Sequence, residues 1–475
     1  MPSVQKLALV SLVLLTLGLQ PALAQPGQTS VQDRAAALAE AFRRGEKSAA
    51  VGISAIDIAT GKALIAVNAD QRRTPASNQK IVTSALAMEA LGGDFNFTTC
   101  LYQVGNDLVI VGDFDPAFGD PVLAAEAGKT IYADLDVWSQ QVKTKLGSNF
   151  AGRLLTLGEK PAGGYRHANW PASQRDHWYS APVASLNFNN NCIDVAFTSD
   201  KNGISAVIYP ESKFIPIASK LSIGRKQVWS LRMNADCSGG TLTGTVSGAS
   251  EPASTAIDDP PILFARTFGQ RLLEAGVAWT GQFDRLAEKD FDKSKATLVA
   301  QTSRPLAVVM ARANKRSLNM VAEAMFLRAC GGTWDKGAQI ASDMLIKAYG
   351  LNEESFKISD GSGLSKANEI SPAAITKLLL AVSRRKDAKV FIGSLPIAGV
   401  DGTMEKRLTQ EPYKAHVLGK TGYVAGASCL SGYILDPAGK PAIAFSVMVN
   451  KMVGLANAKR LEEDVCKTLV DSVNR

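Results

Sequence analysis

Three short polar motifs, far apart along this 475-residue chain, constrain how it can fold. In order, they are Ser77-x-x-Lys80, Ser317-x-Asn319 and Lys420-Thr421-Gly422. Together they supply a hydroxyl nucleophile, a lysine three residues away, a second Ser/Asn pair and a Lys-Thr-Gly strand edge, which are the groups of an active-site serine acyltransferase. A fold that uses all three motifs must bring both halves of the chain to one site.

The residues that follow Ser77 have the pattern of an amphipathic helix, with apolar side chains at helical spacing through residues 81–91. Thr74 is suited to cap this helix and Pro75 to occupy its first position. We therefore predict that Ser77 lies in the first turn, near free backbone N–H groups. Because residues i and i+3 share a helix face, Lys80 is expected beside the Ser77 hydroxyl.

Two of the motifs also occur elsewhere in the chain. Ser-x-x-Lys recurs at residues 3–6, inside an apparent leader, and at residues 383–386, which have the pattern of a charged helix end. Ser-x-Asn recurs at residues 185–187, in what resembles a strand end entering a polar turn, and it remains a competing candidate. Lys-Thr-Gly occurs once.

The first residues have the pattern of a secretory signal. A positive charge at Lys6, an apolar run over residues 7–19 and the tripeptide Ala22-Leu23-Ala24 predict a signal peptide at residues 1–24, cleaved after Ala24. No later segment reaches membrane-spanning length. The net charge of +8 is compatible with peripheral contact to an acidic wall polymer or an anionic membrane surface, and equally with solubility alone. No run of Lys and Arg interleaved with aromatic residues suggests nucleic-acid binding.

Six cysteines in a chain expected to be exported predict at least one disulfide. Fifteen pairings are possible, and the spacing does not choose among them. The alternative is six free thiols buried as small apolar residues. Without a Cys-x-x-Cys motif or histidines at ligand spacing, no metal or other cofactor is expected.

Strand patterns near both ends of the chain predict an α+β domain whose sheet is built from both ends. Residues 49–58 and 64–68 are predicted strands before the Ser77 helix, and residues 428–435 and 441–450 form a predicted hairpin before a terminal helix at residues 456–473. Between the second and third motifs helical patterns dominate, at residues 320–329, 336–349 and 373–382.

From about residue 95 to about residue 293 the pattern changes to short alternating stretches rich in Gly, Asn, Asp and Pro. We interpret this part as a β-rich insertion of one or two smaller domains. The catalytic domain is then split into residues 25–94 and 294–475, with the insertion at residues 95–293. Because all three motifs lie outside the insertion, we expect it to shape substrate choice and to supply no catalytic group.

The motifs suggest a division of labour among their side chains. A serine hydroxyl needs a base, and Lys80 can serve as one if it is unprotonated. A buried lysine near a second cation loses its proton more easily, and Lys420 is the expected second cation. Lys420, helped by the Thr421 hydroxyl, is also suited to hold a substrate carboxylate.

The remaining motif residues are assigned to proton relay and substrate binding. Ser317 is expected to relay a proton to the leaving amine, and Asn319 to position the substrate backbone, although Ser317 alone also fits an ordinary helix cap. The backbone N–H groups of Ser77 and Tyr423 are expected to form an oxyanion hole. The strand edge at Gly422 invites pairing with an extended peptide.

Longer strings around the motifs are similar to those of the class C low-molecular-mass penicillin-binding proteins, the D-alanyl-D-alanine carboxypeptidase/endopeptidases of bacterial peptidoglycan. The matching strings are residues 314–319 with Ala322-Glu323, Asp360-Gly361-Ser362-Gly363-Leu364-Ser365, residues 394–403, Ser431-Gly432-Tyr433 and residues 112–116. The resemblance implies a DD-peptidase/β-lactamase-like catalytic domain, an antiparallel sheet with helices, that is interrupted by inserted domains. It also implies a periplasmic location, peptidoglycan stem peptides as substrates and covalent acylation of Ser77 by β-lactams.

The chain departs from that family's pattern at two positions. Leu318 stands where a polar residue is common, and Tyr423 where Ser or Thr is usual. In this family an aspartate near a Trp-rich segment of the insertion can meet the diaminopimelate side chain of the substrate. Asp176 is the nearest candidate by resemblance, and an exposed loop carboxylate is the alternative.

Three other functions use similar residues. A class A β-lactamase needs a glutamate-held water, and no Glu-x-x-Leu-Asn string is present. A non-catalytic wall-binding sensor is disfavoured because every expected reactive group is present. An esterase on the same fold would hydrolyse simple esters and spare D-Ala-D-Ala peptides. The oligomeric state and the balance of carboxypeptidase and endopeptidase action are left open.

Overall fold

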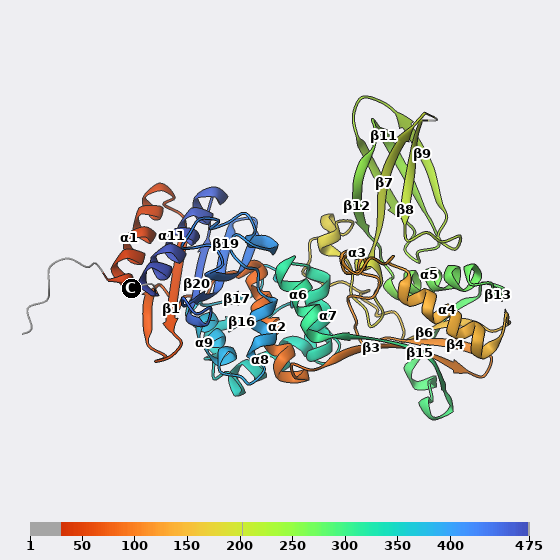
Figure 1. Cartoon of the computed structure of the whole chain (residues 1–475), viewed down its shortest axis with the longest axis horizontal. Coiled ribbons are helices and arrows are strands. Elements are labelled where there is room, and N and C mark those ends of the chain that lie inside the picture. Colours follow the sequence, from red (N-terminus) through yellow and green to blue (C-terminus); the bar gives the residue numbers. More distant parts are fainter. Residues whose placement is uncertain (1–29, 202, 474–475) are drawn as a thin grey trace, which may run out of the picture.

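The computed structural model describes residues 30–201 and 203–473. The predicted signal peptide at residues 1–24 lies outside these residues. In Figure 1 the molecule is elongated: the first and last parts of the chain fold together at one end, and the middle of the chain forms the other. No helix within the described residues is long and apolar enough to cross a membrane.

The two ends of the chain share one antiparallel five-stranded sheet with the order β18-β19-β20-β1-β2. Its strands are β18 (Val417–Val424), β19 (Ala427–Leu435), β20 (Pro441–Asn450), β1 (Ala50–Asp57) and β2 (Ala63–Val67). The central strand β20 pairs with β1 along its length, which joins sequence positions almost 400 residues apart. The predicted sheet built from both chain ends is confirmed.

Helices cover both faces of this sheet, and for that reason β19 is buried at every residue. One face packs against α1 (Val31–Gly45) and α11 (Leu455–Val473). The other face packs against a helical layer that contains α2 and α9. The helices on this side are α2 (Gln79–Leu91), α6 (Leu306–Lys315), α7 (Asn319–Ala329), α8 (Trp334–Lys347), α9 (Pro372–Ser383) and α10 (Ala388–Ser394), with the two-residue strands β16 (Phe356–Lys357) and β17 (Glu369–Ile370) nearby.

The start of the Ser77 helix differs from the prediction. Thr74 does not cap it; instead its backbone N–H donates to Asn450 Oδ1 at 2.7 Å. A 3-10 turn, Ala76–Asn78, precedes α2, and Ala76 has a left-handed φ of 48°. Gly363 allows this turn, because a Cβ on Gly363 would lie 1.8 Å from the Ala76 carbonyl oxygen. Long-range packing therefore overrides the local capping signal.

The insertion begins with a five-stranded sheet of order β14-β6-β4-β3-β15. Its strands are β14 (Phe283–Leu286), β6 (Leu154–Leu157), β4 (Asp107–Val111), β3 (Asn96–Val104) and β15 (Thr297–Pro305). Because β15 pairs with β3, this sheet extends past the predicted boundary at residue 293 and reaches Pro305. The same part holds helices that its Gly-rich pattern did not predict, together with a short strand pair: α3 (Pro121–Glu126), α4 (Ala133–Leu146), α5 (Pro260–Glu274), β5 (Asn149–Phe150) and β13 (Ala278–Trp279).

A second module within the insertion consists of two three-stranded sheets, β12-β7-β8 and β10-β11-β9. Its strands are β7 (Cys192–Asp200), β8 (Gly203–Tyr209), β9 (Ile217–Ile223), β10 (Val228–Met233), β11 (Gly240–Val246) and β12 (Ser250–Ala256). The two sheets enclose a small core that includes Ile193, Phe197 and Leu242. In Figure 1 this module projects away from the rest of the insertion.

All six cysteines lie within the described residues and all are free, so the predicted disulfide is wrong for this structure. Cys192, Cys330 and Cys429 belong to the core of the helical layer, Cys466 lies on the opposite side of the large sheet, and Cys237 lies in the small β module. Cys100 is partly exposed and the other five are buried. Burial raises the pKa of the Cys330 thiol to about 12, which keeps it unreactive.

We therefore expect the mass of the purified protein to be unchanged by reductant. Iodoacetamide should label at most Cys100 in the native protein and all six thiols after unfolding, because five are buried. Intact-mass measurement tests both statements. A mass gain on reduction, or fewer than six labels on the unfolded unreduced chain, would restore the disulfide prediction.

Candidate active site

The structure brings the three motifs together beside the edge strand β18. Ser77 lies in the 3-10 turn before α2, Ser317 just before α7, and Lys420 on β18. Gly422 lets β18 lie against the turn, because a Cβ there would be 2.8 Å from the Pro75 carbonyl oxygen. A pocket of about 280 Å³ opens at this junction, lined in part by Ser77, Ser317, Thr403, Thr421, Gly422 and Tyr423.

Lys80 is fully buried and has three partners. Its Nζ lies 3.0 Å from Ser77 Oγ, 2.7 Å from Asn319 Oδ1 and 2.8 Å from the Ser362 carbonyl oxygen. Burial lowers the pKa of Lys80 to about 7, although the nearby carboxyl groups of Glu323 and Asp360 oppose this shift. A neutral amine has two N–H donors and one lone pair. Asn319 and Ser362 accept the two N–H groups, which leaves the lone pair for the Ser77 hydroxyl.

Lys420 forms a second polar group with Ser317. Its Nζ donates to Ser317 Oγ at 2.9 Å and to the Thr421 carbonyl oxygen at 2.7 Å. Burial, and then the charge of Lys80, lower the pKa of Lys420 well below its usual value. Ser317 has a left-handed φ of 57°, and no side chain caps α7, so the helix-cap alternative for Ser317 is wrong. The costly backbone conformation turns its hydroxyl toward Lys420.

The outer rim of the pocket carries hydroxyl groups and one aromatic ring. Thr421 Oγ1 and Thr403 Oγ1 lie 2.8 Å apart, which makes a pair of hydroxyls next to Lys420. Tyr423 follows on the same strand and is 56% exposed, so its ring stands at the pocket mouth. Thr403 lies in one of the strings that match the family, and the motifs alone assigned it no role.

Asn319 connects the catalytic domain to the insertion. Its Oδ1 accepts from Lys80, and its Nδ2 donates to the Tyr179 carbonyl oxygen at 2.8 Å. A second contact joins Trp170 of the insertion, through Nε1, to Asp360 Oδ2 at 2.9 Å. The insertion therefore touches the site directly, which the positions of the motifs did not indicate.

Behind Lys80 lie two buried acidic residues, Glu323 and Asp360, which belong to strings that match the family but to which the sequence assigned no role. Glu323, one helical turn after Asn319, accepts from the backbone N–H groups of Ser362 at 2.7 Å and Gly361 at 3.0 Å. It thereby fixes the peptide units that present the Ser362 carbonyl to Lys80. Burial, and then the nearby carboxyl of Asp360, raise the pKa of Glu323 to about 8. The spacing from Asn319 to Glu323 was the signal available for finding it.

The other candidates lie apart from this cluster. Asp176 is exposed and does not line the pocket at Ser77; its carbonyl oxygen accepts from the Ala256 backbone N–H. The Asn187 side chain is buried in a turn, where it bonds Ala184 and Asn191, so this Ser-x-Asn motif has a structural role. Ser383 ends helix α9. Within the described residues no group of three or more His, Cys, Asp or Glu side chains is placed to hold a metal ion.

This arrangement, with a serine and lysine at a helix start, a Ser/Asn pair on a neighbouring helix and a lysine on an edge strand, defines a serine acyltransferase of the penicillin-interacting class. Residues 34–470 match the model of the D-Ala-D-Ala carboxypeptidase 3 (S13) family. The chain belongs to this family, and it is a serine-type D-Ala-D-Ala carboxypeptidase by class. The resemblance inferred from the motifs is confirmed.

Individual relatives agree with this family. A D-alanyl-D-alanine carboxypeptidase of Actinomadura sp. (strain R39) is 29% identical over 496 residues, which cover 94% of this chain and 87% of the relative. The crystal structure of penicillin binding protein 4 from Haemophilus influenzae superposes with a TM-score of 0.73 at 19% identity, covering 91% of this chain and 99% of that one. The same protein in complex with a β-lactam gives a TM-score of 0.70 at 20% identity, covering 92% and 99%. The predicted α+β fold with an inserted part is confirmed.

Proposed function

We propose that this protein cleaves the D-Ala-D-Ala bond of peptidoglycan stem peptides through an acyl-enzyme on Ser77, with Lys80 as the base. The observation that carries the proposal is the surroundings of Lys80. Two oxygen acceptors, on Asn319 and Ser362, take the N–H groups of the neutral Lys80 amine. The remaining position on Nζ, which holds the lone pair, faces Ser77 Oγ at 3.0 Å. That geometry suits a neutral lysine that accepts the serine proton.

Acylation then takes place in a defined order. Ser77 Oγ attacks the carbonyl carbon of the penultimate D-Ala, and its proton passes to Lys80 Nζ. As the C–N bond breaks, the leaving amine takes a proton from the Ser317 hydroxyl, and the proton that Lys80 gained passes to Ser317, so that Lys80 is neutral again. The backbone N–H groups of Ser77 and Tyr423 are proposed to stabilise the oxyanion. In the second half-reaction water attacks the acyl carbonyl and gives a proton to Lys80, and Lys80 returns it to Ser77 Oγ as the acyl bond breaks and the shortened peptide leaves.

The far side of the pocket is suited to the substrate carboxylate. Lys420 and Thr421 lie on β18, and Thr403, in the neighbouring 3-10 turn Gly402–Met404, pairs its hydroxyl with that of Thr421. A carboxylate placed there would favour the protonated form of Lys420 and accept hydrogen bonds from its amine and from both hydroxyls. β-Lactams carry a comparable carboxylate, which supports covalent inhibition at Ser77. We place this activity in the periplasm on the basis of the predicted signal peptide.

The deciding experiment uses defined muropeptides and the purified mature protein. Pentapeptide monomers should lose their terminal D-Ala, and prior treatment with benzylpenicillin should block the loss. Mass spectrometry of products from cross-linked dimers measures endopeptidase action in the same assay. A penicilloyl adduct with no muropeptide turnover would indicate the wall-sensor alternative, and turnover of simple esters alone would indicate an esterase.

A separate prediction concerns Lys420. Lys420→Ala should lower acylation by benzylpenicillin about 100-fold, because a charged, hydrogen-bonded anchor for the carboxylate is lost. A neutral activated ester should lose much less. The control is Lys440→Ala, which makes the same change in an exposed turn. Equal losses for both substrates in Lys420→Ala would assign Lys420 to proton transfer rather than to carboxylate binding.

A further inference from the structure

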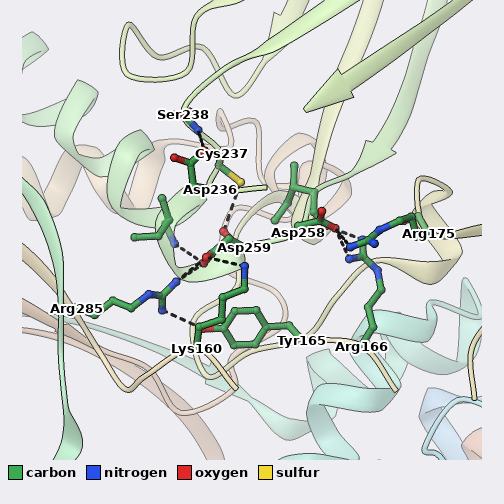
Figure 2. A network of polar contacts seen from close by, with 12 residues as sticks. Lys160, Tyr165, Arg166, Arg175, Asp236, Cys237, Ser238, Asp258, Asp259 and Arg285 are labelled. Atoms are coloured by element: carbon green, nitrogen blue, oxygen red, sulfur yellow. Dashed lines mark hydrogen bonds and ion pairs between the residues drawn. The ribbon is translucent and has the colours of Figure 1, made fainter. Parts of the chain in front are cut away.

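A network of ion pairs joins the small β module, helix α5 and the segment 165–183 that reaches the active site. Figure 2 shows its two centres, the adjacent carboxylates of Asp258 and Asp259. Arg166 and Arg175 both bond Asp258 Oδ1. Arg285 bonds both oxygens of Asp259 at 2.6 Å, and Lys160 lies 3.4 Å from it. The two centres have similar chemistry but different surroundings.

Arg166 bonds more than its carboxylate. Its guanidinium donates to the carbonyl oxygens of Ser180 at 2.9 Å, Arg175 at 3.0 Å and Ile257 at 2.6 Å. The first two carbonyls lie on either side of Tyr179. One largely buried side chain therefore holds both flanks of the short stretch that carries the Tyr179 carbonyl, and Asp258 holds that side chain in place.

The Tyr179 carbonyl decides how the Asn319 amide is turned. An asparagine amide has an oxygen that only accepts and a nitrogen that only donates, and the two are alike in size. A carbonyl oxygen can accept only from the nitrogen, so Tyr179 holds Nδ2 on its side at 2.8 Å. Oδ1 is then turned toward Lys80 at 2.7 Å. If Tyr179 moved away, the amide would be free to rotate and to present N–H groups to Lys80.

We propose that the Arg166–Asp258 ion pair is a positioning anchor through which the insertion holds Asn319 in the orientation that Lys80 requires. Neither residue touches the substrate or the reacting atoms in this scheme. The anchor acts along one path. Arg166 fixes the position of the segment, the segment fixes the position of the Tyr179 carbonyl, and that carbonyl fixes the orientation of the Asn319 amide. The inference rests on the roles proposed above for Ser77, Lys80 and Asn319.

The test is a double-mutant cycle on benzylpenicillin acylation of the full mature protein. Arg166→Lys keeps the charge but cannot reach all four acceptors, and it should slow acylation about tenfold. In an Asn319→Ala background the same change should cost less than about twofold, because its effect passes through the missing amide. Asp258→Asn, a smaller change in the same ion pair, should show the same pattern and decides the matter if Arg166→Lys does not fold.

The matched control is Arg285→Lys, which disturbs the neighbouring pair with Asp259 but bonds no carbonyl beside Tyr179. It should lower thermal stability about as much as Arg166→Lys and leave acylation unchanged. Additive losses in the cycle, or equal losses from Arg285→Lys, would refute the anchor while leaving Ser77 acylation intact. A wild-type protein that forms no Ser77 adduct would instead overturn the site assignment, and the anchor with it.

Discussion

Ser77→Ala is expected to abolish penicillin binding and to lower peptide turnover by about 10⁴-fold or more, because it removes the atom that forms the acyl bond. Wild-type protein incubated with benzylpenicillin should carry one adduct, on the peptide that contains Ser77. The variant should carry none, and its fold should be retained because Ser77 is half-buried at the surface of a pocket.

Ser185→Ala is the control for this prediction. Ser185 begins the second Ser-x-Asn motif, where the buried Asn187 side chain serves a turn. The Ser185→Ala variant should therefore be acylated on Ser77, and should turn over substrate, at the wild-type rate. A penicilloyl group on any peptide other than the one with Ser77, or an adduct that survives in Ser77→Ala, would disprove the nucleophile assignment.

Lys80→Ala should have the next largest effect, a loss of about 10³–10⁴-fold in acylation at neutral pH, because the general base disappears. The pH dependence of the wild-type acylation rate is a more specific test of this role. Burial lowers the pKa of Lys80 to about 7. Below that pH the amine is protonated and cannot accept the serine proton. The acylation rate should fall about tenfold per pH unit there and level off above it.

In Lys80→Ala the overall acylation rate should be low, and the further fall of that rate below about pH 7 (the acidic limb of the pH profile) should be absent. Lys386→Ala, in the Ser-x-x-Lys motif at residues 383–386, removes an exposed lysine and should leave both the acylation rate and its pH dependence unchanged. If the limb persisted in Lys80→Ala, another group would set the pH dependence, and the buried Glu323 would be the first to examine because its pKa is raised to about 8.

Much of the catalytic domain follows from periodicity alone. The strands at both chain ends and the helices α7, α8, α9 and α11 lie where their apolar patterns predicted, within a few residues. Each of these elements buries an apolar face, and the spacing of its apolar residues along the sequence shows whether it is a helix or a strand. The insertion was harder to interpret. Helix α3 has only six residues and none of them is fully buried, and the strand β15 is assigned to its sheet only by pairing with β3.

The candidate reactive groups could be identified from the sequence itself. Ser77, Lys80, Ser317, Asn319 and Lys420 could be named from motif order and from local patterns, and the structure places all five in one cluster. A motif specifies which side chains are available. The Ser77–Lys80 spacing holds even though the helix starts differently from the prediction, because the 3-10 turn runs directly into α2.

Tertiary structure decided which partners these groups have. The left-handed backbone of Ser317, the Glu323 carboxyl behind Ser362 and the Tyr179 carbonyl on Asn319 all depend on contacts between distant segments. The same is true of the cysteines: three of them share one core, yet the packed chain leaves all six free. A buried polar group must find a partner wherever the packed chain offers one. Which partner is available depends on how the apolar faces pack in three dimensions, and no local sequence pattern predicts that packing.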